Sequence, residues 1–354
     1  MKTTKKQKKS NLKVSLLLLL LAAVLLISST YAWFVSQNTA EVSTLQVKIE
    51  TVEGIQISSN AKNWTSTLTN AMITGADYVG SELNYKDAVN QVPSILKPVS
   101  TIGEIDKGKQ KMFLGKVLTS KTDANKGKYV LTATPETDTH GLTGNYITFD
   151  FFINLESTSA KDLYLQPGSG VVWNGERAAA DTNAAYKNDK GLQNAARIAF
   201  IVEGNVDTSQ TEDASTAVQN KIYNQADADC GKYLWEPNSN THTTNAINQS
   251  LAGRDTPMYK AEEQAANPVP YSGVKTAIEE KDDILLANAN VAGNTSFFAA
   301  MTPTLFTDTG FTQRQKLMTI KPGYTKVRAY MWIEGQDMDC YTCLLYTSPS
   351  PRDS

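Results

Sequence analysis

A run of alternating apolar and polar residues near the middle of the chain constrains the fold more than any other feature. The segment NYITFDFFINLES, residues 145–157, places an apolar side chain at nearly every second position. Successive side chains of a β-strand point to opposite faces, so this period of two predicts a strand with one apolar face. We expect its aromatic residues to be buried in the core. The apolar face holds Ile147, Phe149, Phe151, Ile153 and Leu155, and the other face holds Thr148, Asp150 and Asn154.

The same alternation recurs along the chain and predicts further strands. Residues 111–136 predict a β-hairpin, because two alternating runs flank a turn rich in Lys, Asp, Asn and Gly. Residues 315–335 predict a second hairpin, in which Pro322 and Gly323 suit a type II turn. Single strands are expected within residues 43–50, 54–64, 161–173 and 196–205.

The composition changes between about residues 205 and 300, where Asn, Ala, Gln, Asp and Thr dominate and the alternation fades. This stretch predicts a loop-rich insertion with short helices within residues 211–226 and 277–289. Many short strands without alternating βαβ units predict an all-β fold. We therefore expect one antiparallel β-sandwich over residues 33–342, with long loops and small helical insertions.

The N-terminus carries the features of an export signal. Six lysines and no acidic residue precede an uninterrupted apolar run of 12 residues, Leu16–Ile27. A membrane-spanning helix needs roughly 20 apolar residues, so this length fits a signal peptide better. Small residues then precede Ala32, which predicts a signal peptide over 1–32, cleaved between Ala32 and Trp33. The alternative is an uncleaved anchor extended by the aromatic residues that follow, and both place the body outside the cytoplasm.

The junction SSTYAWF, residues 28–34, resembles that of exported proteins processed by SipW-type signal peptidases in Gram-positive bacteria. These are the TasA/camelysin class of surface and biofilm-matrix proteins. The resemblance implies a jelly-roll-like sandwich and fibre subunits in which the N-terminal segment of one copy completes the sheet of its neighbour. It also implies self-association or other matrix proteins as partners. Before cleavage, the partners would be the signal peptidase and the membrane.

Charge and cysteine content limit the partners and the crosslinks. The net charge is −2, and removing the six leader lysines leaves about −8 for the body, which argues against nucleic acid as a partner. The tail CLLYTSPSPRDS, residues 343–354, reads like a translated sequencing adapter, so we expect it to be non-native. Of the three cysteines, this leaves Cys230 and Cys340, and a disulfide between them stays open.

Residues that could carry chemistry are few. The two histidines, His140 and His242, lie in polar segments and are expected to be solvated loop residues. No HExxH motif, GxSxG elbow or phosphate-binding loop is present, so we predict no catalytic residues, no metal ligands and no cofactor. Some camelysin relatives are described as metalloproteases, but that activity is not carried over to this chain, because it has no zinc-binding motif.

Two weaker signals leave alternatives open. The segment EGQDMDC brings Glu334, Asp337 and Asp339 close together, which could hold calcium, although solvated turn acids are the commoner case. Trp235 and Trp332 each lie near a glutamate and could form a sugar platform, although covering a sheet face is the simpler role.

These observations predict an exported, non-enzymatic structural protein of the cell surface or extracellular matrix, and the resemblance implies a fibre subunit that assembles by β-strand addition. The alternative is a secreted adhesin or glycan-binding module. A secreted hydrolase is a third and weaker reading.

Overall fold

A computed structural model describes a large part of the 354-residue chain. The described residues are 40–41, 47–48, 54–74, 85, 87–171, 192–242, 272–285, 295–301, 303–337 and 339–342. The predicted signal peptide, its cleavage site at Ala32 and Trp33, and the predicted adapter tail lie outside them. Within them, no helix has the length and apolar character needed to span a bilayer.

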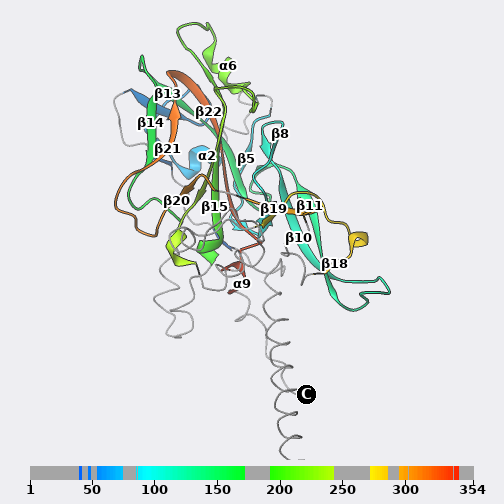
Figure 1. The fold of residues 1–354 in the computed structure, drawn as a ribbon. Helices are drawn as coiled ribbons and strands as arrows, with labels where there is room; N and C mark the ends of the chain where they lie inside the picture. The colour runs from blue at the N-terminus through cyan, green and yellow to red at the C-terminus, as the bar shows by residue number, and fades with distance from the viewer. Residues whose placement is uncertain are drawn as a thin grey trace, which may run out of the picture.

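An eight-stranded sheet forms the centre of the molecule (Figure 1). Its strands pair antiparallel, apart from two short parallel pairs at the two ends of the sheet. The order is β12 (His140–Gly141), β5 (Asn90–Gln91), β13 (Ile147–Leu155), β22 (Gly323–Ile333), β15 (Ala196–Val206), β16 (Gly231–Glu236) and β20 (Leu305–Phe306), and β3 (Ile55–Ser58) pairs with β13.

The strand predicted first, β13, runs from Ile147 to Leu155, over the apolar positions that its alternation indicated. Phe149 and Phe151 are 3% and 5% exposed, which confirms that this face lies in the core. The polar face of β13 is buried too, including Asp150 at 0%. A strand buried on both faces needs a layer on each side of the sheet.

Two smaller sheets supply these layers. The apolar face of the central sheet packs on β14 (Lys161–Leu165) and β21 (Gln315–Ile320), a two-stranded sheet, and on α2 (Asn70–Thr74). The opposite face packs on a four-stranded sheet. That sheet has the order β18 (Ile284–Leu285), β11 (Tyr129–Glu136), β10 (Met112–Thr119), β7 (Val99–Ser100), and β17 (Ser272–Val274) with β19 (Phe298–Ala300) covers its outer side. The all-β, sandwich-like fold is thus confirmed.

Short elements complete the described chain. The helical ones are η1 (Leu192–Ala195), α6 (Ala214–Gln219), η2 (Ser239–Thr241), η3 (Glu280–Asp282) and α9 (Asp339–Thr342). The short strand pairs are β1 (Ala40–Glu41) with β6 (Ile95–Leu96), β2 (Val47–Lys48) with β4 (Thr67–Leu68), and β8 (Ile105–Asp106) with β9 (Lys109–Gln110).

The first predicted hairpin is confirmed, and the second is wrong. Strands β10 and β11 pair along their full length, from Met112 opposite Glu136 to Thr119 opposite Tyr129. Strands β21 and β22 do not pair, because the chain crosses from one layer to the other at Gly323. Gly323 has a φ of +93°, and a Cβ there would lie 2.2 Å from the carbonyl oxygen of Val206. The turn residues were recognised correctly, but they connect two layers instead of two neighbouring strands.

The segment predicted to be loop-rich, residues 205–300, contributes one strand to the central sheet. Strand β16 pairs with β15 from Gly231 to Trp235. The predicted helices appear as α6 and as the single turn η3, which is followed directly by β18.

Candidate functional site

One end of the central sheet gathers a group of buried charged side chains. Strand β15 runs antiparallel to both β22 and β16, so its first residues lie beside the last residues of those two strands. Ala196 is opposite Ile333, and Ile198 is opposite Trp235. The segments that follow β16 and β22 therefore meet next to the start of β15. We call the five residues at this point the histidine cluster: Arg197, Glu236, His242, Asp337 and Asp339.

Local turns fix the two aspartates of the cluster. After β22 the chain turns, and the backbone N–H of Asp337 donates to the carbonyl of Glu334 at 3.2 Å. The carboxylate of Asp337 then accepts from the N–H of Asp339 at 2.9 Å, which starts α9. Aspartate commonly makes such a bond to the backbone two residues on. The spacing Asp-x-Asp in this sequence therefore presents two carboxylates on the same side of the turn.

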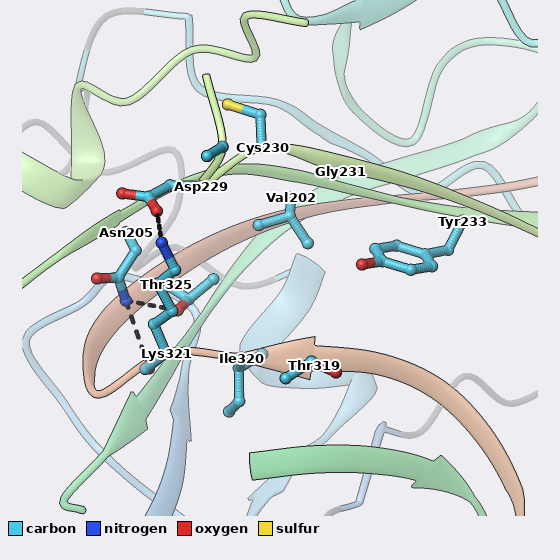
Figure 2. A pocket seen from close by; sticks show the side chains of 11 residues that line it. Val202, Asn205, Asp229, Cys230, Gly231, Tyr233, Thr319, Ile320, Lys321 and Thr325 are labelled. Atoms are coloured by element: carbon cyan, nitrogen blue, oxygen red, sulfur yellow. Dashed lines mark hydrogen bonds and ion pairs between the residues drawn. The ribbon is translucent and has the colours of Figure 1, made fainter. Parts of the chain in front are cut away.

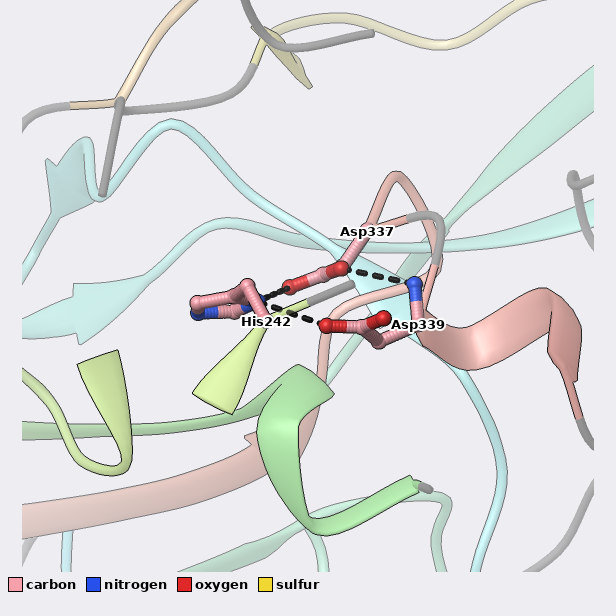
Figure 3. A group of neighbouring side chains, drawn as sticks. All are labelled: His242, Asp337 and Asp339. Atoms are coloured by element: carbon pink, nitrogen blue, oxygen red, sulfur yellow. Dashed lines mark hydrogen bonds and ion pairs between the residues drawn. The ribbon is translucent and has the colours of Figure 1, made fainter. Parts of the chain in front are cut away.

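The carboxylates of Asp337 and Asp339 lie on one side of the imidazole of His242 (Figure 3), and Glu236 lies on the other side. Its Nδ1 lies 2.7 Å from Asp339 Oδ2 and 3.6 Å from Asp337 Oδ2. Its Nε2 lies 2.7 Å from Glu236 Oε1. All four residues are at least nine-tenths buried.

The charged neighbours decide the protonation state of this histidine. Burial lowers the pKa of His242, but Asp337, Asp339 and Glu236 raise it to about 10. Arg197 stands on the other side of the cluster, 2.6 Å from Asp337 Oδ2 and 3.2 Å from Glu236 Oε1. Without a bound cation, His242 is therefore an imidazolium ion at neutral pH.

Several sequence predictions are corrected here. His242 was expected to be solvated, and it is buried with 7% exposure. Asp337 and Asp339 were expected to be solvated turn acids, and they are 5% and 0% exposed. Glu334 does not join them: it accepts from Trp332 Nε1 at 3.0 Å, and burial raises its pKa to about 7. His140, by contrast, is exposed on β12 as expected.

Sequence reasoning missed Arg197 and Glu236 altogether. Each is a charged residue inside an otherwise apolar strand, in ARIAF and YLWEP. A charge at such a position needs a partner, because burying it alone is costly. That signal was present, but it does not reveal which partner it meets.

The disulfide between Cys230 and Cys340 is not formed, because Cys230 is a free thiol. Cys230 directly precedes Gly231, which pairs with Val202 near the end of β15. Cys340 lies in α9, which packs on η1 at the start of β15. Val202 and Ala196, the first residue of β15, are roughly 20 Å apart at about 3.3 Å per residue. A disulfide needs Cα atoms within about 7 Å.

A second group of buried charges lies in the middle of the sheet. We call it the quartet: Asp150, Glu203, Lys326 and Arg328, each at most 1% exposed. Arg328 Nε lies 2.6 Å from Asp150 Oδ1, and Lys326 Nζ lies 2.6 Å from Glu203 Oε2. Glu203 is the extra residue of a β-bulge between Val202 and Gly204. Such a bulge re-aims a side chain, which explains how Glu203 reaches both cations.

Charge pairing sets the titration of the quartet. Burial raises the pKa of Asp150, but Arg328 and Lys326 outweigh this and hold it below its ordinary value. Burial also raises the pKa of Glu203, to about 7, and the two cations offset this only in part. The quartet joins β13, β15 and β22 to one another.

A small pocket lies between β16 and the end of β21 (Figure 2). Its volume is about 60 Å³, and Cys230, Tyr233 and Ile320 contribute to its wall. Lys321 and Asp229 form an ion pair at its rim. Small-molecule sites usually measure about 300–1,000 Å³, so this pocket is too small for such a ligand.

The two tryptophans considered as a sugar platform are both buried. Trp235 is 5% exposed and Trp332 is 0% exposed. Each indole N–H is used internally: Trp235 donates to Thr307 and Trp332 to Glu334. They cover sheet faces, and neither can stack against a sugar.

Comparisons with known proteins identify no relative. A scan against protein-family models gives no match, and neither do searches of curated proteins and of solved structures.

Proposed function

We propose that this chain is an exported structural protein of the cell surface or extracellular matrix, and that its copies assemble by β-strand addition. The observation that carries the proposal is the unequal layering of the sandwich. An eight-stranded sheet is covered on its apolar face by a sheet of only two strands, β14 and β21. In the described part of the chain, the outer edge of β14 has no strand beside it.

The edge of β14 suits an incoming strand. An unpaired strand edge presents a row of N–H and C=O groups that can pair with another chain. Lys161 of β14 is exposed, and the rest of the strand up to Leu165 is half-buried. The other edge of the same sheet, at β21, lies beside the small pocket and β16. We therefore assign β14 as the acceptor edge.

The donor in this proposal is the segment of residues 33–39. It follows the predicted cleavage site and directly precedes β1. Its sequence WFVSQNT supplies aromatic and β-branched residues, which favour strands. The resemblance of SSTYAWF to the junction of SipW-processed matrix proteins supports both export and this mode of assembly.

The two buried groups of charged side chains also fit a structural role. The quartet and the histidine cluster are buried and hold strands and turns together. The alternative function, a glycan-binding adhesin, loses its main argument because Trp235 and Trp332 are buried.

Export and assembly can be tested separately. The chain is produced with its own leader in a Gram-positive host that has a SipW-type peptidase. N-terminal sequencing of the secreted protein should begin at Trp33, within a residue or two. Recovery only from membranes, with the lysine-rich leader intact, would contradict cleavage.

Assembly is then followed by light scattering and electron microscopy of the secreted protein at rising concentration. We expect polymers from the parent chain and none after deletion of residues 33–39. This deletion spares Ala40, which pairs with Leu96. Unchanged circular dichroism and melting would show that the monomer still folds. Polymers that persist after the deletion would overturn strand donation, and a monomeric parent chain that binds glycans would favour the adhesin.

A further inference from the structure

We propose that the histidine cluster is a binding site for a divalent transition-metal ion of the zinc type, with His242 Nδ1, Asp337 and Asp339 as protein ligands. One ligand atom from each of the three residues lies within 4.8 Å of the other two. All three side chains are buried. The inference is independent of the proposed assembly function.

The first argument is that two carboxylates converge on one ring nitrogen. Asp339 Oδ2 and Asp337 Oδ2 lie 2.7 and 3.6 Å from Nδ1. Nδ1 carries at most one proton, and one N–H serves one good hydrogen bond. A single proton on Nδ1 therefore satisfies Asp339 and leaves Asp337 at a longer distance. A cation between the three atoms can contact all of them.

The second argument concerns the other ring nitrogen. Nε2 lies 2.7 Å from Glu236 Oε1. Histidines that bind metals usually donate their other N–H to a carboxylate or carbonyl, which fixes the tautomer and the ring orientation. Glu236 provides this arrangement for a metal on Nδ1. Arg197 and the N–H of Asp339 likewise brace Asp337, at 2.6 and 2.9 Å.

The ligand chemistry selects the class of metal. Calcium and magnesium prefer oxygen ligands alone, whereas imidazole suits zinc and its neighbours in the transition series. Four-coordinate zinc holds nitrogen and oxygen ligands at about 2.0–2.2 Å, which places the ligand atoms roughly 3.4 Å apart. The separation of 3.6 Å between Nδ1 and Asp337 already fits, and Asp339 would move outward by less than 1 Å. Three protein ligands leave a fourth position for water.

Binding would join the segment after β16 to the turn after β22. His242 belongs to the first and both aspartates to the second, and these segments are about a hundred residues apart in sequence. A metal bound only by the folded chain stabilises it by mass action.

The test uses the full chain, kept in mild detergent because of its apolar leader and freed of metal with a chelator. It is titrated with ZnCl₂ by calorimetry, and with CoCl₂ by visible absorption, which reports ligand geometry directly. We expect one tight site per chain, four- or five-coordinate cobalt bands, and a melting temperature that rises on zinc addition.

The two histidines provide a matched control. His242→Gln and Asp339→Asn should each weaken zinc binding at least 100-fold and abolish the cobalt bands. His140→Gln should bind as the parent does, because His140 is exposed on β12. If His242→Gln does not fold, Asp339→Asn carries the test, because it keeps the shape of the side chain. Absence of stoichiometric binding to the parent chain, or equal loss in His140→Gln, would overturn the proposal.

Discussion

The quartet and the histidine cluster are both buried, but they lie on different kinds of structure. All four members of the quartet project from long central strands, and two cations meet two carboxylates. The histidine cluster lies where strands end: Arg197 and Glu236 are at the ends of β15 and β16, the other members follow β16 and β22, and its three carboxylates surround one imidazole. Paired charges inside a sheet can only hold strands together. Carboxylates that converge at strand ends can also receive an ion.

The largest expected effect comes from breaking the quartet. Arg328→Met leaves Asp150 and Glu203 with one cation fewer in a buried site. Removing one partner of a buried ion pair costs about 3–5 kcal/mol. We expect a loss of this size in the free energy of unfolding, measured by urea denaturation. The double variant Asp150→Asn/Arg328→Met should lose less free energy of unfolding than the sum of the losses of the two single variants. Losses that simply add would show that the two residues do not interact.

A substitution on the apolar face of β13, opposite the face that carries Asp150, gives a loss of stability with which the quartet can be compared. Phe151→Ala removes an aromatic ring from the core of the sandwich. Such a truncation costs about 3–5 kcal/mol, because it loses burial and leaves a cavity. The same urea measurement should show this loss. A melting temperature within a degree or two of the parent would mean that β13 is assigned to the wrong face.

The histidine cluster should be less sensitive than the quartet when no metal is present. His242→Gln removes two contacts to carboxylates, but turns at a strand end can adjust more easily than a central strand. A hydrogen bond to a charged group contributes about 1.5–3 kcal/mol, and we expect a loss of this size in chelator-treated protein. A loss as large as that of Arg328→Met would erase the distinction between the two clusters.

Two buried glutamates predict a pH dependence. The pKa values of Glu203 and Glu334 are raised to about 7 in the folded chain, above the ordinary value of 4.5. The folded state therefore holds these protons to higher pH than the unfolded state does. Their contribution to stability is fully present below the unfolded pKa and is lost as the pH rises through about 7.

Melting curves between about pH 4.5 and 8 test this sign. Other titrating groups also change the melting temperature with pH, so the parent is compared with Glu334→Gln, which keeps the size of the side chain and cannot ionise. The melting temperature of this variant should rise relative to that of the parent as the pH rises. A parent and variant that change in parallel would show that Glu334 has no raised pKa.

The smallest effect is expected at Cys230. Its thiol is free and partly exposed, so Cys230→Ser should change the free energy of unfolding by less than about 0.5 kcal/mol. A reducing agent should not shift the melting temperature through this residue. A clear drop in the melting temperature of both Cys230→Ser and the reduced parent protein would show that Cys230 does form a disulfide.

The sequence predicted those parts of the fold that a local pattern encodes. Strand β13 and the hairpin of β10 and β11 follow from alternation and turn composition alone. The crossing between layers at Gly323 does not follow from a local pattern, because the same turn residues can form a hairpin or a change of layer. Strand β16 was hidden within a polar segment, since only six residues of it are strand.

The candidate site was not predictable, for a physical reason. His242 lies in NTHTTN, a polar segment that is typical of a surface loop. Its burial depends on the ends of β15, β16 and β22 meeting, which is a property of sheet topology. The close spacing of Asp337 and Asp339 was noticed, but nothing local indicates that a histidine about a hundred residues earlier lies against them.

The most direct test of the assembly account is a crosslink between copies. Two secreted variants are prepared with Cys230→Ser as background, one with Ser36→Cys in the donor segment and one with Lys161→Cys on β14. They are mixed, assembled and treated with a short bis-maleimide. Strand addition predicts a crosslinked dimer that contains one chain of each variant, with far less product from either variant alone. Polymers that form without any such mixed dimer would show that the N-terminal segment does not pair with β14, and would contradict the account.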